Sequence, residues 1–224
     1  MTAQGRRGLT GQGVVDFLAD AIRSGRFAPG QRLVEADLTR ELGVSRGPVR
    51  EAFRRLAAEG LIEIVPNRGA LVRRLSATEA HELFEIRTEL EALAARRAAT
   101  NMAIQGVRER FEAEIAPIWD TAPRLSSAAY IAENQRFHMA IVTASGSSQL
   151  VELIWRLQLT LILAQIGPAM SSEMIASSLR EHRLIAGAIR ARDPAAAEQA
   201  MREHLGRAMA SLRSMPAELF RRER

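Results

Sequence analysis

Three histidines in the second half of the chain, His138, His182 and His204, each fall on the apolar side of a helical pattern. Asn134 precedes His138 by four residues, so both side chains project from the same side of one helix. Imidazole nitrogens suit Zn²⁺, Ni²⁺ and similar cations, and the core of a helical bundle is a usual place for such a site. The pattern is therefore compatible with a cation site, and also with three independent core histidines that each bond a carbonyl group.

A second set of candidate residues lies in a pattern typical of a helix-turn-helix. Glu35–Leu42 predicts a short helix, Gly43 is typical of the left-handed residue at which a helix ends, and Ser45 is a favourable N-cap for the next helix. Arg46 and Arg50 then lie near the start of this second helix. In such motifs these N-terminal residues meet base edges in the major groove. The alternative is an arginine-rich amphipathic helix whose charged face is simply solvated.

Two short apolar runs, Leu61–Val65 and Ala70–Val72, follow the second helix. The residues between them are Pro66, Asn67, Arg68 and Gly69. Proline, asparagine and glycine are typical of turns, so the pattern predicts a small β-hairpin with a basic tip, or wing.

The order PGxxLxExxL, GVSRxPVREAxxRLxxEGL and PNRGAxV over these fifty or so residues resembles the winged helix-turn-helix of the GntR family of bacterial transcription regulators. The resemblance implies that the second helix and the wing contact double-stranded DNA. Gly47 stands where the family more often has threonine, which removes one hydroxyl group. The candidate DNA-binding residues are Ser45, Arg46, Gly47, Arg50, Arg68 and Gly69.

The patterns NxxFH at 134–138, EH at 181–182 and HL at 204–205 are similar to the FCD-type effector domain of the FadR subfamily of GntR regulators. Metal-binding members hold a divalent ion with an acidic residue or asparagine and three histidines. The resemblance implies that the ligands here are Asn134, His138, His182 and His204, with Zn²⁺ or Ni²⁺ as the metal. Many members have aspartate at the position of Asn134, and a neutral amide oxygen is a weaker ligand than a carboxylate.

The segment FEIRTELEALAARRAA resembles the first helix of the same domain, in which an arginine of some members binds an effector carboxylate. That arginine is Arg87 here. A guanidinium fork beside a cation with open positions would select a small carboxylate. The alternative is a surface arginine that pairs with Glu91, four residues later.

Charge is distributed unevenly along the 224 residues, whose formal net charge is +5. Residues 1–74 hold 13 arginines and 8 acidic residues, whereas the rest of the chain holds 18 of each. The whole positive excess therefore lies with the helix-turn-helix, as attraction to phosphate requires. The absence of cysteine excludes disulfides and thiolate metal sites. Together with the lack of an apolar N-terminal run, it favours the cytoplasm.

A second domain is expected to begin at Ser76, because Ser76-Ala77-Thr78-Glu79 has the form of a helix-capping box. Apolar residues then recur with helical spacing over six segments, at 77–100, 104–120, 126–145, 148–166, 172–191 and 194–213. The most apolar segment, Leu150–Met170, contains Glu152 and Arg156, which favours a buried helix over a membrane span.

The predicted fold is mainly α, with an N-terminal winged helix-turn-helix DNA-binding domain over residues 1–74. An all-α six-helix antiparallel bundle, an FCD-like effector-binding and dimerisation domain, follows over residues 75–224.

The expected function is a cytoplasmic, homodimeric transcription repressor without catalytic residues or membrane contact. It binds a two-fold related operator, and a small carboxylate effector changes its DNA affinity with the help of a divalent metal. Two alternatives remain open. One is a metal-dependent enzyme that activates water at the three histidines. The other is a constitutive DNA-binding protein with a purely structural bundle.

Overall fold

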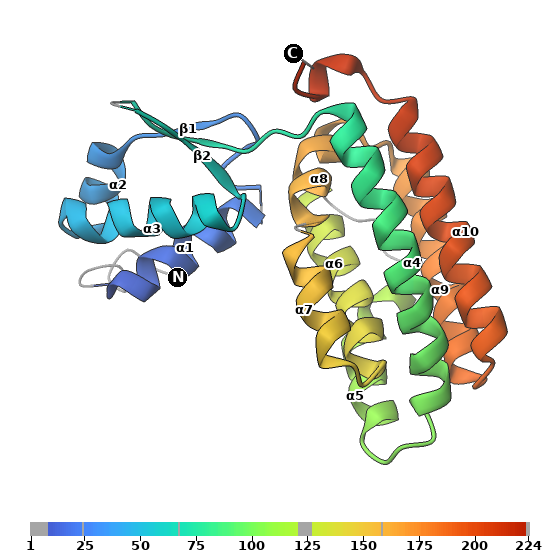
Figure 1. The fold of residues 1–224 in the computed structure, drawn as a ribbon. Coiled ribbons are helices and arrows are strands. Elements are labelled where there is room, and N and C mark those ends of the chain that lie inside the picture. Colours follow the sequence, from blue (N-terminus) through green and yellow to red (C-terminus); the bar gives the residue numbers. More distant parts are fainter. Residues whose placement is uncertain (1–8, 24, 67, 121–126, 158, 223–224) are drawn as a thin grey trace. The chain divides into compact units, whose positions relative to one another are not determined.

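The change from turn-rich to wholly helical sequence near Leu75 coincides with a division of the structure into two units, Met1–Arg74 and Leu75–Arg224. The structure is a computed structural model and describes residues 9–23, 25–66, 68–120, 127–157 and 159–222 (Figure 1). Predictions that concern residue 67, 126 or 158 lie outside the described residues.

The first unit combines three helices with a small sheet. The elements are α1 (Gly11–Arg23), β1 (Arg32–Leu33), α2 (Glu35–Leu42), α3 (Arg46–Ala58), β2 (Ile62–Val65) and β3 (Gly69–Val72). The strands are antiparallel in the order β1-β3-β2, and β2 with β3 forms the predicted wing. Helix α1 packs on α3 through buried apolar residues of both helices, so α1 supports the predicted recognition helix from behind.

The turn between α2 and α3 follows the predicted pattern at its first residue. Gly43 has φ 64° and ψ 33°, the left-handed conformation that glycine adopts without strain, and its N–H bonds the carbonyl of Thr39. Ser45 occupies the N-cap position of α3, but its hydroxyl makes no capping hydrogen bond there. The helix begins at Arg46, directly after Ser45, and its start is therefore fixed by backbone geometry rather than by a serine cap.

The second unit is built from helices α4 to α10 and short 3₁₀ turns. The α-helices are α4 (Ala77–Asn101), α5 (Val107–Ile115), α6 (Ser127–Ala144), α7 (Ser148–Arg156), α8 (Leu159–Ile166), α9 (Ser172–Arg190) and α10 (Pro194–Arg213). The capping box is present: the Ser76 hydroxyl accepts from the Glu79 N–H at 3.1 Å, and the Glu79 carboxylate accepts from the Ser76 N–H at 2.8 Å. Helix α4 packs against α6, α9 and α10 and forms the centre of the unit (Figure 1).

Two of the six predicted helices are interrupted. The segment 104–120 becomes α5 and a 3₁₀ turn, η2 (Ala116–Trp119), because Pro117 lacks the N–H that an α-helix needs. The segment 148–166 is divided into α7 and α8. Helix α7 buries only Leu150 and Ile154 on one stripe, whereas most described side chains of α8 are buried, so the two halves have different environments.

An 18-residue apolar stretch within Ser148–Ala169 has a mean hydropathy of 1.4, and by length and composition alone the segment could cross a membrane. Just over half of this apolar stretch is buried among the described residues, and the break between α7 and α8 divides it.

Gly69 is a position where only glycine fits. Its φ is +91°, and a Cβ built there would lie 2.3 Å from the carbonyl oxygen of Leu33 on β1. We predict that Gly69→Ala lowers the free energy of unfolding of the first unit by about 1–3 kcal/mol, because backbone strain and a steric clash both oppose the wing.

Gly47→Ala is the matched control for this substitution. A Cβ at Gly47 meets nothing within 4 Å, and alanine is the better helix former. In urea unfolding followed by circular dichroism, the unfolding midpoint of Gly47→Ala should equal or exceed that of the wild type. Equal midpoints for Gly69→Ala and the wild type would contradict the close approach of β3 to β1.

Candidate functional site

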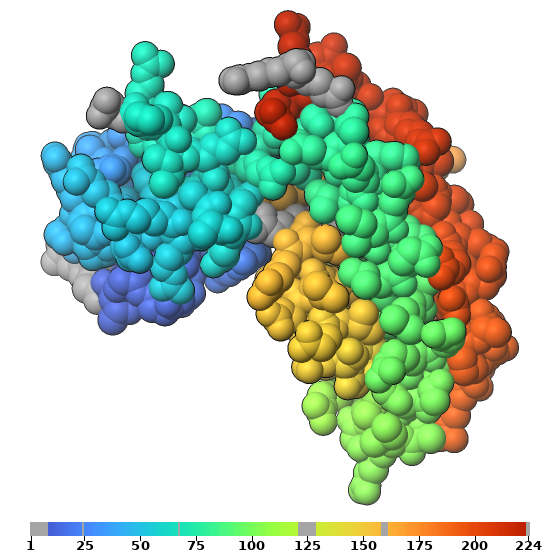
Figure 2. Space-filling view, viewed as in Figure 1, coloured from blue at the N-terminus to red at the C-terminus, as the bar shows by residue number. Residues whose placement is uncertain are grey.

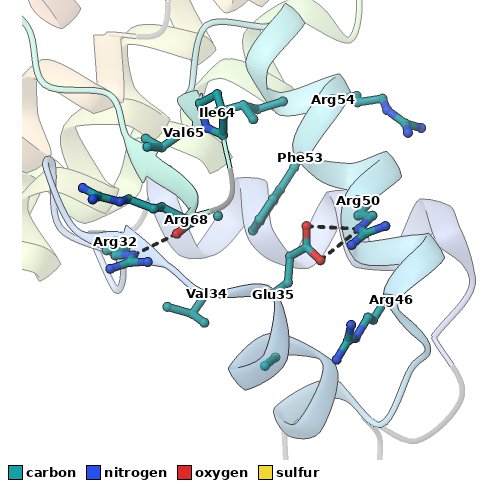
Figure 3. A pocket seen from close by; sticks show the side chains of 13 residues that line it. Arg32, Val34, Glu35, Arg46, Arg50, Phe53, Arg54, Ile64, Val65 and Arg68 are labelled. Atoms are coloured by element: carbon teal, nitrogen blue, oxygen red, sulfur yellow. Dashed lines mark hydrogen bonds and ion pairs between the residues drawn. The ribbon is translucent and has the colours of Figure 1, made fainter.

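An arginine-lined groove of about 500 Å³ lies between α3 and the wing in the first unit (Figure 3). Its charged lining residues are Arg32, Glu35, Arg46, Arg50, Arg54 and Arg68. Five positive charges face one negative charge, on a surface that also contains the exposed Ile64. The arrangement can bind a polyanion such as a nucleic-acid backbone.

Four of the six predicted DNA-binding residues line this groove, namely Arg46, Arg50, Arg68 and Gly69. The other two, Ser45 and Gly47, are exposed at the start of α3 but are not among the lining residues.

Two contacts in the groove were missed by the sequence analysis because they join residues far apart in the chain. The Arg50 Nε donates to both carboxylate oxygens of Glu35, at 2.9 and 3.2 Å (Figure 3). The Arg32 Nε donates to the carbonyl oxygen of Arg68 at 2.8 Å. The first contact holds Arg50 in one orientation, and the second places another guanidinium beside the wing.

The three candidate histidines meet in the second unit although they come from α6, α9 and α10. His138, His182 and His204 are buried, and one ring nitrogen of each lies within 4.8 Å of the others. Phe137 stacks on His182 with ring centroids 4.1 Å apart, which closes one side of the cluster.

Two glutamates orient the rings, and neither was singled out as a ligand partner from the sequence. The His138 Nδ1–H donates to Glu91, and the His204 Nδ1–H donates to Glu181 at 2.7 Å. This leaves the Nε2 lone pair of each ring for another partner. Carboxylates that accept from the second nitrogen of a metal-binding imidazole are typical of metal sites. The sequence signals available were the i+4 spacing of Glu91 from Arg87 and the EH pair at 181–182.

The cluster passes a test of fit for a cation. The His138 Nε2 and the His182 Nδ1 are fully buried, and neither has a hydrogen-bond partner among the described residues. Buried polar atoms without partners are costly and rare in folded proteins. Neutral nitrogen donors from three helices are also the donor set that Zn²⁺ and Ni²⁺ favour.

Burial is also the main reason why these imidazoles are neutral. It lowers the pKa of His138, His182 and His204 below the ordinary value of histidine. Burial by itself would raise the pKa of Glu91, but the Arg87 charge and the hydrogen bonds from His138 and Arg87 outweigh it and lower that pKa. The site therefore combines an ionised carboxylate with neutral rings, which are the protonation states that cation binding requires.

Asn134, the fourth predicted ligand, lies on α6 one turn before His138 and is buried. Its Oδ1 accepts from the Tyr130 hydroxyl at 3.3 Å. Asn134 and His204 both line a cavity of about 430 Å³ that opens beside the cluster.

Arg87 lines the same cavity, and the alternative of a surface arginine is wrong, since only 4% of its side chain is exposed. The expected pairing with Glu91 is nevertheless present, from Nε to Oε1 at 2.6 Å. Glu91 thus bonds Arg87 with one carboxylate oxygen and His138 with the other.

The lowered histidine pKa values predict how the stability of the metal-free protein depends on pH. Unfolded histidine titrates near 6.5, above the folded values, so the unfolded state binds more protons as pH falls. The histidine contribution is present above the unfolded pKa of about 6.5 and is lost progressively as pH falls toward about 4, the pKa of folded His138. Urea unfolding of chelator-treated protein should show a midpoint that decreases over this range.

Two variants test the origin of that slope. His182→Gln and, independently, His204→Gln each remove one buried imidazole and should flatten the slope. A midpoint that is constant between pH 7.5 and 5 in the wild type would contradict the neutral, buried cluster.

Comparison with known proteins follows the same division of the chain. Residues 10–72 match the bacterial regulatory proteins of the gntR family, and residues 82–207 match the FCD domain. A protein of Paenarthrobacter nicotinovorans named "Probable D-xylose utilization operon transcriptional repressor" is 33% identical over 194 residues, 86% of this chain and 84% of that protein. The HTH-type transcriptional repressor RspR of Escherichia coli K12 is 30% identical over 195 residues, 86% of this chain and 84% of RspR.

Among solved structures, Escherichia coli McbR/YncC shares the fold. It matches with a TM-score of 0.78 at 24% identity, over 91% of this chain and 97% of that one. The family matches and the two repressors together establish that this chain belongs to the GntR family of bacterial transcription regulators, as a metabolite-responsive DNA-binding protein with an FCD effector domain.

Proposed function

We propose that the protein is a cytoplasmic, homodimeric repressor that binds a two-fold related operator and responds to a small carboxylate beside a divalent cation. The observation that carries the proposal is the buried histidine cluster. Two of its nitrogens have no hydrogen-bond partner within the described part of the chain, and the cluster lies against a cavity that is also lined by a buried guanidinium.

DNA binding is assigned to the groove between α3 and the wing. Arg46 and Arg50 are one helical turn apart and exposed at the start of α3, where side chains can reach guanine O6 and N7 in the major groove. Arg68 of the wing provides a contact to phosphate or to the minor groove. Ser45 and Gly47 bring the backbone at the start of α3 close to the DNA.

The cation is assigned to His138, His182 and His204, with Asn134 as the oxygen ligand. A bound Zn²⁺ or Ni²⁺ would supply a positive charge that attracts a carboxylate oxygen. Glu91 and Glu181 keep the tautomers of two rings fixed, so the chain itself holds the donor nitrogens ready before any ligand enters.

The effector carboxylate is assigned to the floor of the cavity, next to Arg87. The hydrogen bond from Arg87 to Glu91 uses Nε, and the guanidinium fork has further N–H donors for a second acceptor. A carboxylate that approaches Arg87 meets a charged partner in a site with little solvent, where charge-assisted hydrogen bonds are strong.

A displacement caused by a ligand in the cavity can be transmitted through α8. Leu163 and Ile166 of α8 line the cavity, and Gln165 between them holds the backbone of Leu75 with two hydrogen bonds, of 2.9 and 3.0 Å. Leu75 is the first residue of the second unit after the DNA-binding unit. A ligand that shifts α8 therefore acts on the segment that connects the two units, provided that it binds the two arrangements with unequal affinity.

Dimer formation is assigned to the surface formed by α4 and α7, which lie side by side on the helical unit (Figure 2). Ile86 of α4 and Leu153 and Trp155 of α7 are each nearly half exposed. Large exposed apolar side chains favour association, and two half-sites multiply the discrimination that one winged domain can reach.

The groove assignment predicts that Arg50→Ala weakens binding to the specific operator by about 1–3 kcal/mol, since a bidentate contact to guanine is lost. Arg40→Ala is the matched control, because Arg40 is exposed on α2 and does not line the groove. Fluorescence anisotropy with a labelled operator measures both variants. Operator affinities of Arg46→Ala and Arg50→Ala that both equal the wild type would refute the assignment of α3.

The cation assignment predicts that the wild type holds one divalent ion per chain and that the double substitution His138→Ala and His182→Ala abolishes it, because two of three nitrogen donors are removed. His81→Ala should retain the ion. Elemental analysis of protein dialysed against Zn²⁺ gives the stoichiometry. An unchanged metal content in the double variant would eliminate the site.

The dimer assignment predicts that Trp155→Glu shifts the protein toward the monomer at micromolar concentration, because a charge is placed in an apolar contact. Leu184→Glu on α9, where the leucine is more exposed, is the control and should remain dimeric. Sedimentation velocity distinguishes the two. A monomeric wild type that binds its operator as one chain per site would contradict the dimer.

A further inference from the structure

The cavity beside the histidine cluster has a polar floor and apolar walls, and this contrast bears on the chemical class of the effector. The floor is formed by Arg87, Asn134 and His204. Three charged residues, Glu173, Glu181 and Arg207, also line the cavity. Most of the wall is nevertheless formed by seven large apolar side chains: Phe84, Leu163, Ile166, Met170, Met174, Leu212 and Met215.

The apolar part lies at one end of the cavity. Met174 precedes His182 by eight residues on α9, and Leu212 follows His204 by eight residues on α10. Helices α9 and α10 are packed together and joined by a short turn, so both displacements point the same way along the unit. At 1.5 Å per residue the apolar end lies roughly 12 Å from the level of the histidines.

The hydroxyl groups along the walls are already engaged. The Tyr130 and Ser178 hydroxyls are hydrogen-bonded to each other at 2.7 Å, Ser177 donates to Glu181, and Ser211 donates to the carbonyl of Arg207. The Glu181 carboxylate also accepts from Arg207, at 2.7 Å. A ligand rich in hydroxyl groups would therefore have to compete with these existing bonds, and each of its groups that stayed unpaired would cost free energy.

The methionines define the entrance. Met170, Met174 and Met215 are neither fully buried nor fully exposed, and they come from three different segments. Methionine is unbranched and polarisable, so it adapts its shape to an apolar group that inserts between such side chains. Three of them around one opening favour a flexible apolar chain or a flat ring over a compact polar molecule.

Resting on the proposed function, which places a carboxylate at the floor, we infer that the effector is an amphipathic monocarboxylate. Its head group lies at Arg87 and the histidine cluster, and an unbranched aliphatic or aromatic body extends about 12 Å to the methionines. Short hydroxy acids and sugar acids fill the floor but leave the apolar walls in contact with water.

A chain-length series tests this inference. Zinc-loaded protein is titrated by calorimetry with acetate, butanoate, hexanoate and octanoate, and with malate and gluconate as polar comparisons. Each added methylene should lower Kd by about threefold to fourfold until the cavity is filled. Octanoate should bind far more tightly than malate or gluconate. A Kd that does not change with chain length, or tighter binding of gluconate than of octanoate, would overturn the inference.

Substitutions at the apolar end distinguish the contribution of the walls to ligand binding from that of the floor. Met174→Gln and, independently, Met215→Gln should weaken octanoate binding about tenfold and leave acetate binding unchanged. Met139→Gln, outside this cavity, is the control. Equal octanoate affinity in both cavity variants and the wild type would contradict the placement of the apolar body.

Operator binding, measured in the same samples, distinguishes failure of the amphipathic ligand from failure of the proposed effector function. Malate or gluconate that binds tightly and changes operator affinity, while octanoate does not bind, leaves the carboxylate-responsive regulator intact and refutes the amphipathic ligand. If no carboxylate of either kind binds or changes operator affinity, the proposed effector function fails, and this inference fails with it.

Discussion

The carboxylate of Glu91 is completely buried in the centre of the helical unit, and the site depends on how it is compensated. One oxygen accepts from the Arg87 guanidinium and the other from the His138 ring, so α4 and α6 are held in a fixed register. Removal of Arg87 would leave an uncompensated buried charge, which typically costs about 3–5 kcal/mol. The same pairing directs the guanidinium of Arg87 into the cavity and the Nε2 of His138 toward the other two histidines.

A related device recurs in the DNA-binding unit. Glu35 on α2 accepts from the Arg50 Nε with both carboxylate oxygens, whereas Glu91 accepts from the Arg87 Nε with one. The difference lies in solvent: Arg50 is exposed, so its pair with Glu35 contributes little to stability, and a DNA base or phosphate can compete for the guanidinium. The buried pair fixes a site, whereas the exposed pair orients an arginine that remains available to DNA.

Local signals in the sequence predicted the turn of the helix-turn-helix at Gly43 and the start of the second unit at Ser76, because each of these signals acts within a few residues. Helical periodicity placed the three histidines on inward faces. Pro117 explains one interrupted helix and could have been used to predict it. Glu91 with His138, Glu181 with His204 and Glu35 with Arg50 could not be predicted, because those pairs form only after distant helices have packed.

The claim that three imidazoles from three helices bind one divalent cation is tested most directly by X-ray absorption at the zinc edge of the zinc-loaded protein. The account predicts a shell of nitrogen and oxygen ligands at about 2.0–2.1 Å, with multiple scattering from three imidazoles and no sulfur. His138→Ala should reduce the imidazole count to two. A spectrum with fewer than three imidazoles in the wild type, or one that is unchanged in His138→Ala, would contradict it.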